Sequence, residues 1–142
     1  MSQIVVGYDG SPAGVAALAA ALDLAPPLGD KVVVVFGYAP PGPWGGEIAE
    51  HEEAIEELGE KVMAQARAQA AARGAEIEEE LVAKRPVEAL IGVGAEREAR
   101  MIVVGSQGEA PLKGMILGST PSKLLHLAER PILVVPAGDA TE

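Results

Sequence analysis

Short apolar runs alternate with longer helix-like segments along the whole chain. The runs are rich in Val and Ile and are bounded by Gly, Pro, Asp or Ser, as buried strands are. Most of them show no alternation of apolar and polar residues, which is typical of strands covered on both faces. The predicted strands are residues 4–8, 31–38, 76–83, 101–105 and 131–136, of which 76–83 carries glutamates and is expected to be partly exposed. The segments between them predict helices at residues 13–25, 47–73, 86–99 and 119–129.

Proline, glycine and small polar residues mark the predicted helix ends. Asp9 or Ser11 is expected to cap the first helix, and the pair Pro26-Pro27 is expected to stop it. Gly74 is expected to end the second helix. The apolar residues of that helix recur at helical spacing and should share one face: Ile48, Ile55, Leu58 and Val62.

The order β-α-β-α-β-α-β-α-β predicts a single α/β domain over residues 1–142, with a frayed tail at 137–142. Buried strands joined by helices form a parallel sheet covered on both faces. We therefore expect a five-stranded, three-layer sandwich of the Rossmann-like or flavodoxin-like kind. Such sheets bind ligands beyond the carboxyl ends of their strands. The segments of interest are therefore 7–11, 37–44 and 105–120.

The amino-acid composition argues against several classes of partner and chemistry. The chain has 142 residues, of which 49% are hydrophobic and 3% aromatic, and its formal net charge is −10. Nucleic acids and anionic membranes need a basic or aromatic surface, so we expect neither as a partner. The absence of cysteine excludes thiolate chemistry and iron–sulfur clusters, and two histidines leave little for a His-rich metal centre. We see no signal peptide and no apolar stretch of membrane-spanning length, so we expect a cytoplasmic protein.

A glycine pattern between the fourth and fifth predicted strands carries the most specific chemistry. Glycine lets backbone N–H groups approach an anion, and the start of the following helix adds free N–H groups and a positive dipole end. Serine and threonine hydroxyls at that start are further donors. The spacing fits neither a Walker A loop nor the dinucleotide fingerprint, so it predicts a phosphate site of another kind. The pattern reads Gly105-Ser106-Gln107-Gly108, nine further residues, and then Gly118-Ser119-Thr120.

Each candidate residue also has a purely structural interpretation. Asp9 contacts a ribose or a magnesium ion, or it only caps the following helix. The glycines bind an anion, or they only form turns. Ser119 donates to phosphate, caps the helix, or does both. Trp44 covers an adenine or, as we favour, packs a loop onto the surface. His51 and His126 are expected to be solvated or structural, and the glutamates of the second helix to form a solvated acidic face.

The glycine pattern resembles the ATP-binding signature of the universal stress protein family. The opening Ile4-Val5-Val6-Gly7-Tyr8-Asp9-Gly10-Ser11, the pair Arg85-Pro86 and the closing segment 131–136 also resemble that family. The similarity therefore covers nearly the whole chain. It implies a sheet with strand order 3-2-1-4-5 and a nucleotide that lies over the carboxyl ends of strands one and four.

Carried over by position, the resemblance also implies roles for single residues. Gly7, Tyr8 and Asp9 would edge the adenosine, with Asp9 near the ribose or near Mg²⁺ or Mn²⁺ on the nucleotide, and Gly37 would line the adenine. The residues that would hold the phosphates of ATP, ADP or AMP are Gly105, Ser106, Gln107, Gly108, Gly118, Ser119 and Thr120. The family commonly forms homodimers through its fifth strand, and an apolar edge strand does need a partner. The residues of that strand are Ile132, Leu133, Val134 and Val135.

The function implied is that of an ATP-binding regulatory or stress-response protein. It would be a homodimer that hydrolyses ATP slowly at most, and whether it is an enzyme stays open. The alternative is a dimeric interaction module of the same fold that binds no nucleotide, because Glu109 would repel phosphate if it pointed inward. An enzyme that uses ATP to adenylate a substrate is disfavoured, because 142 residues leave little room for a second substrate pocket.

Overall fold

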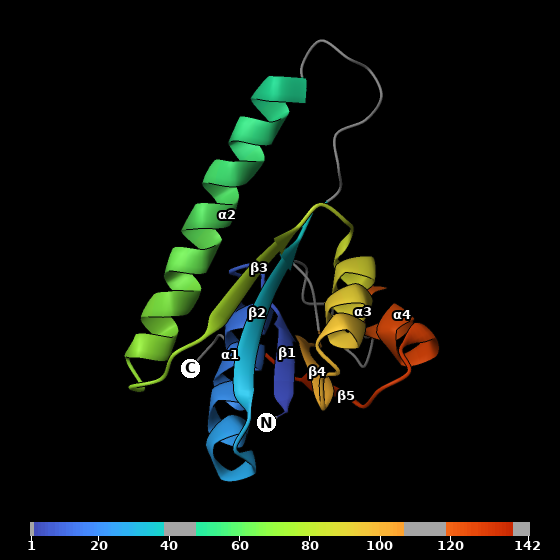
Figure 1. Ribbon diagram of the computed structural model, residues 1–142. Helices are drawn as coiled ribbons and strands as arrows, with labels where there is room; N and C mark the ends of the chain where they lie inside the picture. Colours follow the sequence, from blue (N-terminus) through green and yellow to red (C-terminus); the bar gives the residue numbers. More distant parts are fainter. Residues whose placement is uncertain (1, 39–47, 107–118, 138–142) are drawn as a thin grey trace.

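Strands and helices alternate along the described part of the chain, as the apolar runs predict. The computed structural model describes residues 2–38, 48–106 and 119–137 (Figure 1). The strands are β1 (Gln3–Gly7), β2 (Lys31–Gly37), β3 (Glu78–Val82), β4 (Met101–Gly105) and β5 (Ile132–Val135). The helices are α1 (Pro12–Leu28), α2 (Ile48–Ala71), α3 (Pro86–Glu96) and α4 (Ser119–Leu127).

The strands form one parallel sheet in the order β3-β2-β1-β4-β5. This confirms the predicted α/β fold and the strand order that the family resemblance implies. β1 lies at the centre, with β2 on one side and β4 on the other, so the strand order reverses beside β1. The carboxyl ends of β1 and β4 therefore flank the position at which sheets of this kind bind ligands. β3 and β5 are the two edges.

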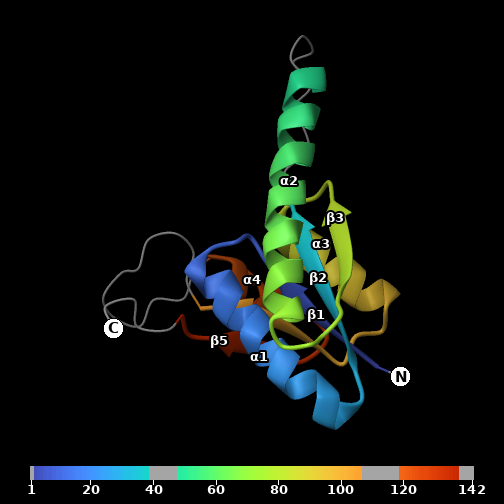
Figure 2. The ribbon, with the colours of Figure 1, turned by 90° about the vertical axis from the view of Figure 1, so that its left-hand side faces the viewer.

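Alternate residues of the central strands face opposite sides of the sheet, which creates two apolar cores. Ile4 and Val6 of β1 pack with α1 and α2, in what we call the α1–α2 core. Val5 packs with α3 and α4, in what we call the α3–α4 core. In Figure 2, α1 and α2 lie in front of the sheet and α3 and α4 lie behind it. The three predicted layers are thus present.

α1 continues through Pro26 and Pro27, so the prediction that these residues stop it is wrong. Each of the two prolines lacks the N–H group for one helical hydrogen bond, and the turn is closed by the residues that follow. Gly29 has a left-handed φ of 70°, and its N–H donates to the carbonyl of Pro26 at 3.1 Å. The N–H of Asp30 donates to the carbonyl of Ala25 at 3.0 Å. This Schellman closure ends the helix at Leu28.

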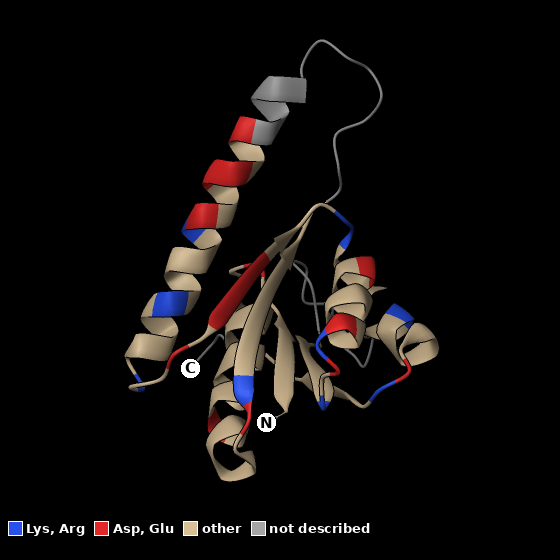
Figure 3. Cartoon of the chain, in the orientation of Figure 1, with Lys and Arg blue, Asp and Glu red and all other residues tan. Residues whose placement is uncertain are grey.

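α2 is longer than the sheet that it covers. Its amino-terminal half rises beyond the carboxyl ends of the strands (Figure 1). Of the four residues predicted to share one face, Val62 is buried, Ile55 is half-buried and Leu58 is 47% exposed, and the side chain of Ile48 lies outside the described part. Carboxylates dominate the charge of this half (Figure 3), as expected for a solvated acidic face. The residues that bury α2 lie further along it: Val62, Met63, Ala66 and Ala70.

α3 and α4 both end earlier than predicted. Glu98 has a φ of 49°, and the N–H of Ala99 donates to the carbonyl of Gly94 at 2.9 Å, which closes the end of α3. After α4, Pro131 disfavours the helical conformation at Arg130. The guanidinium of Arg130 donates to the carbonyl of Ala99 at 2.9 Å, which ties the end of α4 to the end of α3.

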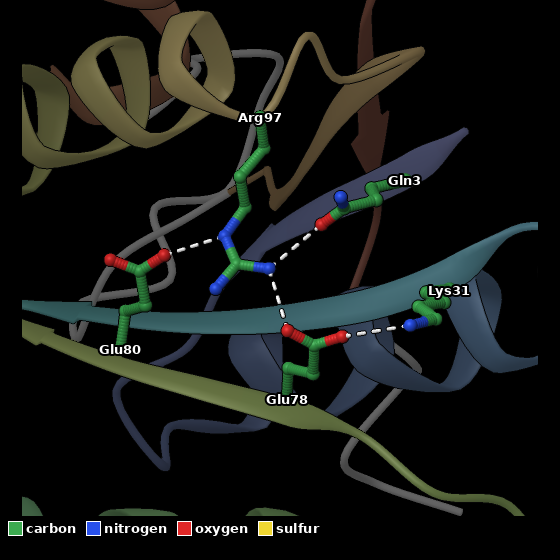
Figure 4. A network of polar contacts seen from close by, with 5 residues as sticks. All are labelled: Gln3, Lys31, Glu78, Glu80 and Arg97. Carbon is green, nitrogen blue, oxygen red and sulfur yellow. Dashed lines mark hydrogen bonds and ion pairs between the residues drawn. The ribbon is translucent and has the colours of Figure 1, made fainter. Parts of the chain in front are cut away.

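A polar network joins the amino-terminal ends of β1, β2 and β3 to the end of α3 (Figure 4). Arg97, which follows α3, donates to Glu78 at 2.8 Å and to Glu80 at 2.6 Å, both in β3. It also donates to Gln3 of β1 at 2.8 Å. Lys31 of β2 forms an ion pair of 3.5 Å with Glu78. The network lies at the edge of the sheet opposite the strand carboxyl ends, so it supports the framework rather than the candidate site.

Candidate functional site

A pocket opens at the carboxyl edge of the sheet, where β1 and β4 end. Its empty space, with open solvent included, is about 670 Å³. Strand ends and the first turns of α1, α3 and α4 surround it. The described residues that line it are Gly7, Tyr8, Asp9, Ser11, Ala13, Gly14, Val35, Phe36, Gly37, Pro86, Leu90, Val104, Gly105, Ser119, Thr120 and Pro121.

The turn between β1 and α1 forms one wall of the pocket and is held by its own side chains. Asp9 Oδ1 accepts from the backbone N–H of Ser11 at 2.9 Å and from its hydroxyl at 2.5 Å. Ser11 Oγ in turn accepts from the N–H of Gly14 at 3.2 Å. Ser11 is therefore the N-cap of α1, and Asp9 braces that cap. The second carboxylate oxygen of Asp9 has no hydrogen-bond partner among the described residues.

Helix amino termini supply the positive potential of the pocket. Ser11, Pro86 and Ser119 lie at the starts of α1, α3 and α4, and a helix start leaves N–H groups without an intrahelical partner. Among the described lining residues, Asp9 is the only charged one. An anion held by this part of the pocket would thus contact N–H groups and hydroxyls rather than Lys or Arg.

Two of the predicted glycines are required for close packing. A Cβ on Gly105 would lie 2.5 Å from Ala13 Cβ and 2.6 Å from its carbonyl oxygen, so glycine lets α1 begin directly against the end of β4. A Cβ on Gly37 would lie 2.9 Å from Ala89 Cβ and 2.9 Å from the carbonyl oxygen of Lys84, at the start of α3. Because these two residues have no side chain, the starts of α1 and α3 can lie close to the strand ends at the pocket. Direct contact between the two glycines and a ligand stays a prediction.

Tyr8 reaches the pocket from the end of β1, while its side chain is 3% exposed and belongs to the α1–α2 core. Its hydroxyl donates to Gln69 Oε1 at 3.3 Å. Burial raises the pKa of Tyr8, and the nearby Asp9 carboxylate raises it further. The side chain therefore remains a neutral phenol and a hydrogen-bond donor at neutral pH.

The structure brings many of the predicted site residues together. Ser106 is described but does not line the pocket, and its N–H donates to the carbonyl of Val135 at 2.8 Å. Gln107, Gly108 and Gly118 lie outside the described residues, as do Trp44 and Glu109. The predicted residues that line the pocket are Gly7, Tyr8, Asp9, Gly37, Gly105, Ser119 and Thr120.

Sequence reasoning missed several lining residues. Ser11 lies in the segment of interest 7–11 but is predicted there only as a cap, and Pro86 is predicted only as a helix start. The rule that a helix start offers free N–H groups would have found them. No sequence pattern marks Leu90 as a lining residue, because only the packing of α3 against the sheet brings its side chain to the pocket. The side chain lies close to the end of β1, since a Cβ on Gly7 would be 3.0 Å from Leu90 Cδ1.

Other kinds of site find little support in residues 2–38, 48–106 and 119–137. Within these ranges, no group of three or more His, Asp or Glu residues could hold a metal ion. The helices that the structure describes include none with the length and apolar character needed to cross a bilayer. β5, the strand expected to form a dimer, is an edge of the sheet, and Ile132, Leu133, Val134 and Val135 are all half-buried.

Comparison with known proteins gives a consistent result. Residues 1–136 match the sequence model of the Universal stress protein family. A universal stress protein from Thermus aquaticus is 34% identical over 136 residues, which are 93% of this chain and 96% of the relative. The structure of the universal stress protein from Archaeoglobus fulgidus in complex with dAMP has a TM-score of 0.71 at 25% identity, covering 95% of this chain and 98% of the neighbour. A universal stress protein in complex with cAMP has a TM-score of 0.69 at 27% identity, covering 96% and 98% of the two chains.

Some relatives are longer than this chain. It spans 44% of the length of the universal stress proteins from Mycobacterium bovis and Mycobacterium tuberculosis to which it is 31% identical. The matched region nevertheless includes every strand and helix of the described fold. The chain belongs to the universal stress protein family.

Proposed function

We propose that the pocket binds an adenine nucleotide, with ATP as the expected ligand, and that the protein is a nucleotide-dependent regulatory or stress-response protein. One observation carries the proposal: the pocket lies over the carboxyl ends of β1 and β4, between the first turns of α1 and α4. Helix starts at this position are the usual anion site of doubly wound sheets. Two similar structures hold cAMP and dAMP, so adenine nucleotides are ligands of relatives with this fold.

The lining divides into apolar and polar parts that suit the two ends of a nucleotide. Pro86, Leu90 and Val104 offer apolar surface of the kind on which a base packs. The hydroxyls of Ser119 and Thr120, together with the N–H groups at the helix starts, are donors toward phosphate. Gln107, Gly108 and Gly118 are proposed as further phosphate contacts on the strength of the sequence pattern alone.

We further infer that Mg²⁺ or Mn²⁺ accompanies the nucleotide. Asp9 is the one charged residue among the described lining residues, and its carboxylate would repel an uncomplexed triphosphate. A divalent cation on the phosphates would turn this repulsion into attraction, and Asp9 has one oxygen that no described residue engages. Asp9 is thus assigned to binding the ribose or the cation rather than to activating water. Hydrolysis is then slow at most.

A homodimer through β5 is part of the proposal. Its support is an apolar strand at the open edge of the sheet, which exposes backbone N–H and C=O groups and half-buried apolar side chains. A second candidate function is a dimeric interaction module that binds no nucleotide. The observation that favours it is the charge of the lining, where the described residues offer an anion a carboxylate and no cationic side chain.

Denaturing freshly purified protein and chromatographing the supernatant beside ATP, ADP and AMP distinguishes the two functions. The proposal expects an adenine nucleotide near one equivalent per chain, or calorimetric binding of added Mg·ATP that weakens when the cation is omitted. A protein that is purified empty and gives no heat with Mg·ATP would support the interaction module instead.

The substitution Ser119→Ala tests the pocket assignment. A hydrogen bond to a charged group contributes about 1.5 kcal/mol or more, so the Kd for Mg·ATP should rise by about tenfold. Ser122→Ala is the matched control, because Ser122 is exposed on the same helix and does not line the pocket. Equal calorimetric affinities of the two variants would remove Ser119 from the site.

A further inference from the structure

We propose that Gln65 and Gln69 of α2 position the pocket wall formed by the β1–α1 turn, and that α2 thereby senses whether the pocket is occupied. The inference rests on the proposed nucleotide site and goes beyond it, because neither glutamine lines the pocket. Both residues act on the site through the turn that they hold.

Gln65 contacts the β1–α1 turn at Gly10, whose backbone has a left-handed conformation. Gly10 has a φ of 82°, and Gln65 Nε2 donates to its carbonyl oxygen at 3.4 Å. A Cβ on Gly10 would lie 3.0 Å from Gln65 Oε1 and 4.0 Å from Val62 Cγ2, so α2 lies directly against the turn. Gly10 stands between Asp9 and Ser11, which both line the pocket. A movement of its carbonyl therefore moves the pocket wall.

Gln69, one helical turn further along α2, holds both ends of the same wall. Its Nε2 donates to the carbonyl of Val15, in the first turn of α1, at 2.8 Å. Its Oε1 accepts from the hydroxyl of Tyr8, which follows β1, at 3.3 Å. A carboxamide carries a donor and an acceptor on one planar group, so Gln69 satisfies both partners at once. The strand end and the helix start are thus clamped to one residue of α2.

The two glutamines act at the level of the pocket, whereas a third link between α2 and α1 lies away from it. Arg73 donates to the carbonyl of Ala19 at 3.3 Å and forms an ion pair with Asp23. None of these three residues lines the pocket, and Ala19 and Asp23 follow the first turn of α1. Arg73 therefore offers a contact between the same two helices that stabilises the fold without holding the turn.

These contacts connect the pocket wall to α2. A ligand that binds Asp9 or the start of α1 favours one arrangement of the turn, and that arrangement is the one in which both glutamines find their partners. Occupancy of the pocket then lowers the mobility of α2 at the level of Gln65 and Gln69.

The test compares the full-length double variant Gln65→Ala/Gln69→Ala with Arg73→Ala and with the unaltered protein, by calorimetry and amide hydrogen exchange. We expect the double variant to bind Mg·ATP about 3- to 30-fold more weakly, and Arg73→Ala to keep the original affinity. Mg·ATP should slow exchange at residues 9–15 in every protein. It should slow exchange at residues 62–70 of α2 in the unaltered protein and in Arg73→Ala, but not in the double variant.

The outcomes separate this inference from the proposed function. If the unaltered protein binds Mg·ATP and the double variant keeps both its affinity and the protection of α2, the inference is overturned and the nucleotide site stands. If neither the unaltered protein nor the variants bind nucleotide, both the proposed function and the sensing role are overturned. In that case, amide exchange at residues 9–15 without ligand tests whether the two glutamines position the β1–α1 turn. If they do, these residues exchange faster in the double variant than in Arg73→Ala. Gln65 is exposed, so Gln65→Ala alone supports the same comparison if the double variant does not fold.

Discussion

Arg100 and Asp30 form an ion pair in which the carboxylate partner is buried. The Asp30 side chain is 1% exposed, and Arg100 holds both of its oxygens, with Nε and Nη2 at 2.5 and 3.1 Å. We predict that Arg100→Ala lowers the urea midpoint of unfolding more than Arg67→Ala does, because it leaves a buried carboxylate unpaired. The Arg67 pair with Glu79 is more open to solvent and should contribute little. Equal midpoints for the two variants would contradict this account.

The network around Arg97 predicts a specific dependence of stability on pH. The hydrogen bond from Arg97 lowers the pKa of Glu78, and Lys31 lowers it further. Because the folded-state pKa lies below the unfolded value of about 4.3, the stabilisation is full above that pH and is lost as the pH falls through the folded pKa. The difference in unfolding free energy between the unaltered protein and Arg97→Gln should therefore be greatest at neutral pH and shrink below about pH 4.

Urea unfolding at a series of pH values from 7 to 3 measures this difference directly. Arg85→Gln is a suitable control, since Arg85 is exposed and makes no hydrogen bond or ion pair through its side chain with another described residue. Its stability should follow that of the unaltered protein at every pH. A constant gap between the curves of Arg97→Gln and the unaltered protein would show that Glu78 gains nothing from Arg97.

At the scale of elements, apolar runs were sufficient to predict which segments form strands and helices. Val32 to Val35 are all buried, as a strand covered on both faces requires. Helix ends were harder, because they depend on hydrogen bonds that a propensity pattern does not contain. Pro26 and Pro27 remain helical since Gly29 and Asp30 close the turn behind them. Leu58 is 47% exposed although the next residue, Gly59, lies against Leu81 of β3, and helical spacing alone does not tell these two positions apart.

At the scale of the whole molecule, the strand order came from the family resemblance and not from the pattern of apolar residues. Many topologies accept the same elements, whereas the order β3-β2-β1-β4-β5 determines which strand ends meet at the pocket. The candidate residues next to those ends could be predicted for that reason. Gln65 and Gln69 could not, because they resemble ordinary polar residues of a surface helix until the sheet places them beside Gly10 and Tyr8.

The proposed dimer gives a prediction about the open edge of the sheet. The N–H groups of Ile102 and Ser106 in and after β4 donate to the carbonyls of Pro131 and Val135 at 3.0 and 2.8 Å. Alternate residues of a parallel strand bond to the same neighbour, so the N–H of Val134 points to the open edge. Val134→Pro removes that donor at a position where an edge strand tolerates proline, and it should convert the dimer to a folded monomer in sedimentation equilibrium.

Val134→Ala is the control for this experiment, because it removes most of the same side chain and keeps the N–H group. It should sediment as a dimer if backbone pairing along β5 holds the two chains together. If Val134→Ala dissociates as fully as Val134→Pro, side-chain packing rather than strand pairing makes the interface. If Val134→Pro remains a dimer with its circular dichroism unchanged, the interface lies elsewhere, and the apolar edge of β5 needs another cover.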